Sequence, residues 1–327
     1  MSLDKILFEF EKYDVDIYLN LENTIKKLLI FTPDIPHPGQ GQTLIRWKTL
    51  AKVGFTNLTL AKWFESHLDA LSILEELNYS PVRKGLWAVW AAEGSLEPIH
   101  FKQDLCSGQK NWCSGAGLVD YGLLTYKDEH NHSQLLIVDM DQPHIQIQHK
   151  DWQAIGMQHT RTASLYFNQV SAEAVGHDNA YLQRPGFWHG AAGVAACWFG
   201  ATARLADFLY QECQTKPHSY RLMYLGKIST LLFTTKQYFH HVANQIDQYP
   251  AKSHELIIRM LRAQVEQTAQ TVLEQVGKAL GARPFCENKT FAALAADLPV
   301  FLRQSHAAFD EKQIGERVLE EGDSWML

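Results

Sequence analysis

The segment GQKNWCSGAG spans residues 108–117 and is the most informative part of this sequence. Within it, Trp112 lies two positions before Ser114 in a stretch typical of a β-strand. Side chains two positions apart on a strand point to the same face. A flat indole and a hydroxyl donor on one face suit a flat heteroaromatic ring that is hydrogen-bonded at a ring nitrogen. The alternative interpretation, which the spacing alone favours, is a buried tryptophan next to an ordinary strand serine.

Two further segments flank this one along the chain. LWAVWAAEG at residues 86–94 places Trp90 next to Ala91 and Ala92, small residues that let a ligand lie against the backbone. The same segment is equally consistent with a core strand. GMQHTRTASLYFNQV at residues 156–170 ends in alternating apolar and polar positions typical of a strand.

The middle of the chain has the two-residue period of β-strands. Apolar runs are separated by polar turns such as KDEHNHS and MDQP. The runs are GLLTYK, QLLIVDM, HIQIQH and ASLYFNQV. They predict a middle antiparallel β-barrel domain over residues 84–183.

Helical periodicity dominates on both sides of this domain. It predicts an N-terminal helical domain over residues 1–83 and a C-terminal helical bundle over residues 184–327. Glycine and alanine in GAAGVAACWFGATARLADFL, residues 190–209, permit close helix packing. Apolar positions recur along one stripe at Ile257, Leu261, Val265, Val272, Val276 and Leu280. The resulting fold class is α+β, and the lack of βαβ alternation or a GxGxxG turn argues against a Rossmann domain.

Composition narrows the functional classes. The 327 residues are 46% hydrophobic and 20% charged, as in ordinary soluble folded proteins. The net charge of −6 provides no basic field, so nucleic acid is not expected as a partner. The five cysteines form no CxxC pair, which favours a reducing cytoplasm. We expect no secretion signal and no membrane-spanning segment.

Histidine pairs raise the question of a metal site. His240 and His241 are adjacent, and His130 and His132 share the KDEHNHS turn. Adjacent histidines on a helix point in different directions, and we expect no Asp, Glu or Cys to complete a ligand set with either pair. The sequence therefore predicts no metal site.

Taken in order, the three segments resemble the acyl-CoA dehydrogenase family of flavoproteins. That family carries a Thr-Glu-Pro strand, a G-x-K-x-W-Ile-Thr-Asn strand and a Gly-Met-Arg-x-Ser-x-Thr strand ahead of its C-terminal bundle. Here the second reads GQKNWCSG and the third GMQHTRTASLYFNQV. The resemblance covers residues 50–306 and identifies the chain as a divergent member.

The resemblance implies bound FAD in a homodimer or homotetramer. It implies that Trp112 stacks beside the isoalloxazine and that Ser114 lies at flavin N5. It places Trp90, Ala91 and Ala92 along the pyrimidine side. Gly281, in GKALGARPF, corresponds to the family's glycine-rich turn near the FAD diphosphate.

The chain departs from the family pattern at several points. Thr-Glu-Pro is replaced by residues 92–94, Ala-Glu-Gly, and the family's Arg-x-x-Phe-Gly segment has no match. The catalytic glutamate is also absent, and the family spacing from Gly281 leads to His306 in LRQSHAAFD. A neutral imidazole can accept a proton near neutral pH, so His306 is the candidate catalytic base. We expect it to project from a helix and to be oriented by Asp310 one turn later. The alternatives are that Asp310 or Glu311 is the base, or that no base remains.

Three functional hypotheses follow from the resemblance. The first is an FAD-dependent oxidoreductase that oxidises an acyl thioester, carried by CoA or a carrier protein, at its α,β carbons; its electron acceptor is unknown. The second is a flavin monooxygenase on the same fold, because a histidine at the position of His306 is similar to those enzymes. The third is a non-enzymatic flavin- or acyl-binding scaffold that has lost the catalytic glutamate.

Overall fold

The computed structural model describes residues 2–13, 16–149, 151–322 and 325. They form two compact units, each built from separate stretches of chain. The first unit comprises the described parts of Met1–Ile35, Thr59–Ala154 and Gln158–Phe187, and the second those of Pro36–Leu58, Ile155–Met157 and Trp188–Leu327. The division into domains at residues 83/84 and 183/184 remains a prediction.

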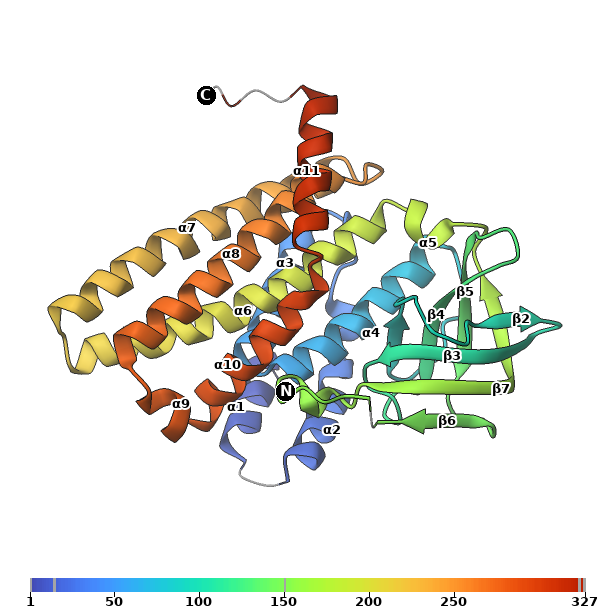
Figure 1. The fold of residues 1–327 in the computed structure, drawn as a ribbon, viewed down its shortest axis with the longest axis horizontal. Helices are drawn as coiled ribbons and strands as arrows, with labels where there is room; N and C mark the ends of the chain where they lie inside the picture. The colour runs from blue at the N-terminus through green and yellow to red at the C-terminus, as the bar shows by residue number, and fades with distance from the viewer. Residues whose placement is uncertain (1, 14–15, 150, 323–324, 326–327) are drawn as a thin grey trace. The chain divides into compact units, whose positions relative to one another are not determined.

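The expected succession of helices, strands and helices is confirmed (Figure 1). The N-terminal helical elements are α1 (Leu3–Lys12), α2 (Ile17–Leu28), η1 (Leu29–Asp34), α3 (Thr43–Thr56) and α4 (Leu58–Glu76). The strands are β1 (Trp87–Trp90), β2 (His100–Lys102), β3 (Leu105–Cys113), β4 (Tyr121–Lys127), β5 (Ser133–Asp139), β6 (Ile145–Gln148) and β7 (Ala163–Val175), with η2 (Gln158–Thr160) before β7. The later helices are α5 (Ala180–Gln183), α6 (Gly186–Thr215), α7 (Ser219–Gln248), α8 (Glu255–Leu280), α9 (Arg283–Glu287), α10 (Lys289–Phe301), η3 (Leu302–Gln304) and α11 (Ala308–Glu321).

The strands of the first unit form an open, mixed sheet and not the closed antiparallel barrel that the sequence predicted. Their order is β1-β4-β5-β7-β3-β2, and β6 also pairs with β7. The long strand β7 joins the two halves, because its C-terminal part pairs with β5 and its N-terminal part with β3 and β6. β1 runs parallel to β4, since the intervening chain passes through β2 and β3 before it returns.

A helix, and not another strand, covers the free edge of β1. The backbone N–H of Trp87 donates to His67 Nδ1 at 3.2 Å, and that of Val89 donates to Ser66 Oγ at 2.8 Å. Both acceptors belong to α4. Their side chains satisfy backbone donors that a barrel would pair with a neighbouring strand. This arrangement explains why the sheet stays open at β1.

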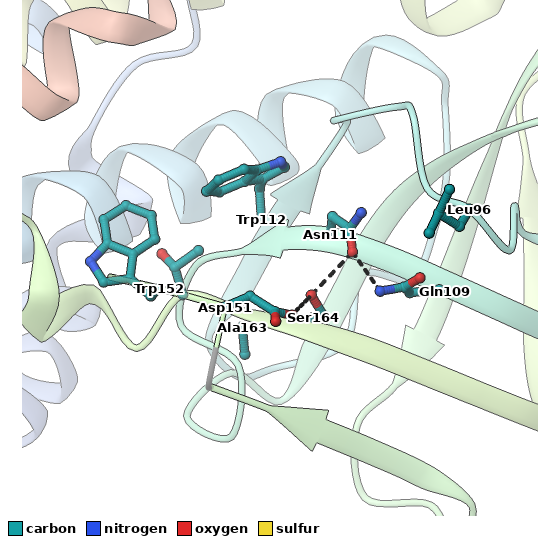
Figure 2. Close-up of a pocket in the computed structure, with 9 residues that line it drawn as sticks. Leu96, Gln109, Asn111, Trp112, Asp151, Trp152, Ala163 and Ser164 are labelled. Carbon is teal, nitrogen blue, oxygen red and sulfur yellow. Dashed lines mark hydrogen bonds between the residues drawn. The ribbon is translucent and has the colours of Figure 1, made fainter. Parts of the chain in front are cut away.

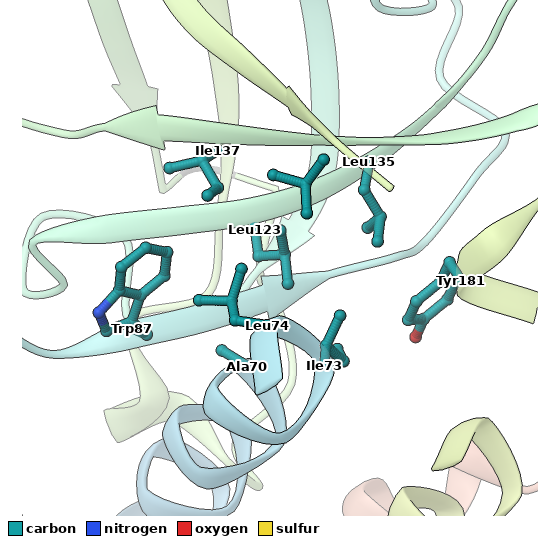
Figure 3. Packing of buried hydrophobic residues seen from close by; sticks show 9 residues of the cluster. Ala70, Ile73, Leu74, Trp87, Leu123, Leu135, Ile137 and Tyr181 are labelled. Atoms are coloured by element: carbon teal, nitrogen blue, oxygen red, sulfur yellow. The ribbon is translucent and has the colours of Figure 1, made fainter. Parts of the chain in front are cut away.

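The same helix packs its apolar face on the sheet (Figure 3). Buried Ile73 and Leu74 lie against Leu123 of β4 and Ile137 of β5. Ala70, Ile73 and Leu74 are an i, i+3, i+4 set on one face of the helix, and Leu135 and Ile137 are two positions apart on β5. The periodicities read from the sequence therefore produce this core.

Helices α3 and α6 of the second unit pack with their backbones in close approach. A methyl group on Gly54 would meet the carbonyl of Cys197, and one on Gly200 would meet the carbonyl of Ala51. The close packing expected from the glycine- and alanine-rich helix is thus confirmed. Helices α7 and α8 lie side by side in the same unit (Figure 1). Leu261, Val265, Val272 and Val276 of the predicted stripe are buried on α8, whereas Ile257 and Leu280 at its ends are half-buried.

The GMQ segment at residues 156–158 begins with a close contact to α10 in the second unit. A methyl group on Gly156 would meet the carbonyl of Ala296, and the backbone N–H of Met157 donates to Asp297 Oδ1 at 2.5 Å. Asp297 is 6% exposed, and burial raises its pKa to about 6 although the hydrogen bond from Met157 opposes the shift. Within the described part of the chain, no helix has both the length and the apolarity needed to cross a membrane.

The packing of α3 on α6 predicts opposite effects of two glycine substitutions. Gly200→Ala should destabilise the protein by about 1–3 kcal/mol, because the methyl group overpacks the helix contact. Gly226→Ala on α7 should stabilise it by up to about 1 kcal/mol, because nothing lies within 4 Å of the added carbon and alanine favours a helix. Urea unfolding measures both changes, and equal effects of the two substitutions would contradict the packing.

The burial of Asp297 predicts a defined pH dependence of stability. With a folded pKa of about 6 against 3.8 unfolded, the protonated group contributes stability that is complete below pH 3.8 and lost as the pH rises through about 6. The loss is about 3 kcal/mol at ~1.4 kcal/mol per pH unit. Asp297→Asn should remove it, so the free energy of unfolding of the variant relative to the wild type should rise by that amount between these pH values. A constant difference would show that Asp297 does not titrate this way.

Candidate functional site

A buried lysine organises the sheet around the GQKNWCSGAG segment. Lys110 on β3 is 2% exposed, and its Nζ donates to the Thr125 carbonyl at 2.5 Å, to Thr125 Oγ1 at 3.0 Å and to Glu93 Oε1 at 3.2 Å. Thr125 Oγ1 in turn donates to Glu93 Oε1 at 2.5 Å. Burial lowers the pKa of Lys110, and the Glu93 carboxylate counteracts that shift. The network ties β3 and β4 to the chain that follows β1.

Trp112 stands at an irregular end of β3. The pairing of β3 with β7 shifts register between Lys110 and Cys113, and Trp112 has a φ of +60°. Ser114 follows in a turn, beyond the end of the strand. The strand alternation used to place Trp112 and Ser114 on one face does not extend to Ser114, because a register shift interrupts the ladder and Ser114 lies outside the strand. The predicted role of both residues in a cofactor site is a separate question and stays a prediction.

A pocket of about 200 Å³ lies beside Trp112 in the first unit (Figure 2). The Trp112 side chain is 60% exposed, and its ring meets that of Trp152 edge to face, with 6.0 Å between ring centroids. The residues that line the pocket are Leu96, Gln109, Asn111, Trp112, Asp151, Trp152, Thr162, Ala163 and Ser164. The pocket thus combines exposed aromatic surface with neutral polar groups and one carboxylate.

Hydrogen bonds hold the polar groups of the pocket in place. Asn111 Oδ1 accepts from Gln109 Nε2 at 2.8 Å and from the Ser164 hydroxyl at 3.1 Å. The Ser164 hydroxyl also lies 2.8 Å from Asp151 Oδ2. Figure 2 shows these side chains along the floor below Trp112. The indole N–H of Trp152 is buried and has no hydrogen-bond partner among the described residues.

Ser114 belongs to a chain of hydroxyl groups. Its Oγ lies 2.9 Å from Thr162 Oγ1, which lies 2.8 Å from Thr160 Oγ1. When Thr160 donates to Thr162 and Thr162 donates to Ser114, the Ser114 proton remains available for another acceptor. The Ser114 carbonyl accepts from Trp90 Nε1 at 3.0 Å. The structure therefore brings Trp90 and Ser114 together.

Ala91 and Ala92 continue from β1 and are half-buried. They precede Glu93, whose carboxylate is fixed on Lys110. Their backbone is thereby anchored next to the strand that carries Trp112.

Gly281 and His306 belong to the second unit. Gly281 ends α8 with a φ of +71°, and its N–H donates to the Gly277 carbonyl at 2.9 Å. His306 lies in the short connection before α11, exposed, and not inside a helix as we expected. The expected orientation of its ring by Asp310 is also wrong. Asp310 Oδ2 accepts the backbone N–H of His306 at 2.8 Å, and Oδ1 is 2.6 Å from Arg259 Nη1.

Sequence reasoning missed several residues of this site. Lys110 is the lysine of the quoted G-x-K-x-W pattern, but nothing in the pattern indicated that it is buried. Asp151 and Trp152 lie in a polar connection with no strand or helix period. Thr160 and Thr162 were visible only as polar positions before a strand. Only the hydrogen bonds that join Thr160 to Thr162 and Thr162 to Ser114 give them a part in the site.

The residues of the first unit fit a flat heteroaromatic ring such as a flavin. Trp112 offers an exposed aromatic face, and Ser114, whose Oγ lies 2.9 Å from the hydroxyl of the lining residue Thr162, offers a donor. Ligand pockets are commonly about 300–1,000 Å³, so this pocket takes part of such a ligand and not all of it. Its lining contains no lysine or arginine, so it suits the ring and not the phosphates.

No protein-family model matches this chain, and no curated protein matches its sequence. Solved structures match it closely in fold. KijD3, in complex with FMN and dTDP-3-amino-2,3,6-trideoxy-4-keto-3-methyl-D-glucose, superposes with a TM-score of 0.79 and 14% identity over 98% of this chain and 92% of its own. Butyryl-CoA dehydrogenase from Megasphaera elsdenii gives 0.78 and 13% over 98% and 99%.

A third match is TdsC from Paenibacillus sp. A11-2 in complex with FMN and indole. It gives a TM-score of 0.77 and 13% identity over 97% of this chain and 95% of its own. At such low sequence identity, the structural matches show a common fold and do not show a common reaction. The chain therefore has the fold of the acyl-CoA dehydrogenase-like flavoproteins and diverges widely from them in sequence.

Proposed function

We propose that this chain is a flavin-dependent oxidoreductase that holds the flavin ring against Trp112. The observation that carries the proposal is the pocket in which an exposed indole lies beside fixed neutral polar groups. The available proton of the Ser114–Thr162–Thr160 hydroxyl chain would donate to a ring nitrogen. The FMN in the complexes of KijD3 and TdsC, which share the fold, supports the choice of ligand.

We propose FAD as the flavin, as the family resemblance implies. Gly281 would lie near the diphosphate, as the resemblance implies. Trp90, Ala91 and Ala92 would contact the pyrimidine side of the ring. Mass spectrometry of the extracted flavin distinguishes FAD from FMN.

The proposed reaction is the α,β-dehydrogenation of an acyl thioester. A bound flavin supplies an acceptor for the β-hydride. The chain must then remove the α-proton, and His306 is the proposed base. Asp310 is less suited to this role, because its two oxygens are engaged by Arg259 and by the backbone of His306. The exposed imidazole of His306 has no such engagement with Asp310.

A second candidate is a flavin monooxygenase on the same fold. It is favoured by the histidine in place of the family's glutamate and by the structural match to a dibenzothiophene monooxygenase, TdsC. In this case oxygen is the electron acceptor and an acyl thioester is not required.

We also propose that the chain forms a homodimer or homotetramer. Helix α7 exposes apolar side chains on the isolated chain, among them Tyr220, Met223 and Phe233, the last 64% exposed. Clusters of large exposed apolar side chains often mark protein interfaces.

Flavin binding should depend on Trp112 and Ser114. Ser114→Ala removes one hydrogen bond, worth about 0.5–1.5 kcal/mol, and should weaken flavin binding by about two- to tenfold. Trp112→Ala should weaken it by a similar or larger factor, because an aromatic contact is lost as well as apolar surface. Fluorescence titration of the stripped protein with FAD and with FMN measures these affinities.

Trp325→Ala is the matched control, because that indole is 89% exposed and lies outside the pocket. It should leave the affinity unchanged. Wild-type protein that neither shows flavin absorbance nor gains thermal stability with excess flavin would contradict the proposal and favour the non-enzymatic scaffold.

His306→Ala should slow reduction of the bound flavin by an acyl thioester by about 10²–10⁴-fold, the usual contribution of a general base. Flavin affinity should not change, because His306 acts on the substrate. Anaerobic stopped-flow absorbance with a panel of acyl-CoA compounds measures the rate. His241→Ala on α7, which removes another exposed histidine of the second unit, should react as the wild type.

Equal rates in the wild type and the His306 variant would remove His306 from catalysis. A flavin-loaded wild type that no thioester reduces, and that oxygenates an aromatic substrate when reduced flavin and oxygen are supplied, would replace dehydrogenation by the monooxygenase candidate.

A further inference from the structure

Two segments far apart in the sequence meet at one end of the sheet. Asp128 and His132 lie in the turn between β4 and β5, and Asp178 lies between β7 and α5. The backbone N–H of Ser133 donates to Asn179 Oδ1 at 2.9 Å, and that of Asn179 donates to the Ser133 carbonyl at 2.8 Å. These bonds hold the segments together independently of the charged groups.

One nitrogen and two carboxylate oxygens converge at this junction. His132 Nδ1 is 3.5 Å from Asp128 Oδ2 and 3.2 Å from Asp178 Oδ2, and all three ligand atoms lie within 4.8 Å of one another. Zinc binds such atoms at ~2.0–2.2 Å, so two ligands of a tetrahedral ion are separated by roughly 3.3–3.6 Å. The two measured separations are close to that value.

The histidine nitrogen points to a positively charged occupant. His132 Nδ1 is shielded from solvent and has no hydrogen-bond partner among the described residues. A bare nitrogen lone pair that faces two carboxylates is repelled by both. Either a proton on the nitrogen or a metal ion between the three atoms removes this repulsion.

A second layer of hydrogen bonds fixes the carboxylates. Asp128 Oδ1 accepts the backbone N–H groups of His130 at 2.9 Å and His132 at 2.8 Å. Gln134 Nε2 donates to Asp128 Oδ2 at 2.9 Å and to Asp178 Oδ1 at 2.7 Å. Such outer partners orient metal ligands and reduce the entropy lost on binding.

We propose that Asp128, His132 and Asp178 bind a divalent transition metal ion, with zinc as the preferred ion and water in its open position. An imidazole with two carboxylates suits zinc better than magnesium or calcium, which prefer oxygen ligands alone. The ion would join the β4–β5 turn to the chain before α5. The sequence predicted no such site because Asp178 is far along the chain from the histidine turn and only the fold brings it near.

Isothermal titration calorimetry of the full chain, freed of metal by a chelator, tests the site with zinc chloride. The wild type should bind one zinc ion that His132→Ala and Asp178→Asn each weaken at least tenfold. His100→Ala on β2 and Asp141→Asn are matched controls, since both residues are outside the cluster, and each should bind zinc as the wild type does. Zinc should also raise the melting temperature of the wild type and not that of the two ligand variants.

Circular dichroism without metal checks that the variants are folded. The Asp178 side chain is 63% exposed, so Asp178→Asn should remain folded. If His132→Ala does not fold, the zinc affinity of Asp178→Asn alone tests the proposal. Equal zinc affinity in the wild type and Asp178→Asn, or no zinc binding to the wild type at 100-fold molar excess, would overturn the proposal and leave a proton as the occupant. Neither readout involves flavin, so the result is independent of the proposed function.

Discussion

The buried ammonium group of Lys110 is the interaction on which the first unit depends. A cation in a protein interior is tolerated only with close hydrogen-bond and charge partners. Here the partners are Thr125 on β4 and Glu93 in the chain after β1. The requirement to satisfy one charge thus fixes three segments at once. Ala91 and Ala92 precede Glu93, and Trp112 follows Lys110, so the proposed flavin contacts are positioned from both sides by the same group.

The fold could be predicted from the sequence wherever a periodic pattern met a matching environment. The middle of the apolar stripe of α8 and the apolar runs that form β4, β5 and β7 are such cases. The prediction of a closed barrel was wrong, because closure depends on which groups accept hydrogen bonds from the edge of β1. His67 and Ser66 do so from a helix. These two polar residues interrupt the apolar pattern of α4, and periodicity alone does not indicate that they bind the backbone of a distant strand.

The site was predictable to a smaller extent. Trp90 and Ser114 were both singled out, and the structure joins them by a hydrogen bond. The polar partners of the pocket could not be found in the same way, because Asp151 and Ser164 acquire a common role only through contact in space. For the same reason, no pattern in the sequence indicated that Asp178 lies next to His132. A site built from distant segments has no characteristic residue spacing in the sequence, whereas a site built on one strand has one.

The conformation of Trp112 helps to decide between the two interpretations of its segment. A structural tryptophan stabilises the fold by packing in the interior, but the Trp112 side chain is 60% exposed. Its φ of +60° is a conformation that costs a residue other than glycine about 1–3 kcal/mol. Neither the strain nor the exposed apolar surface is offset by contacts within the described chain beyond the edge of Trp152. A flat ligand on the free face of the indole would bury that surface, so the conformation favours the ligand-binding interpretation over the structural one.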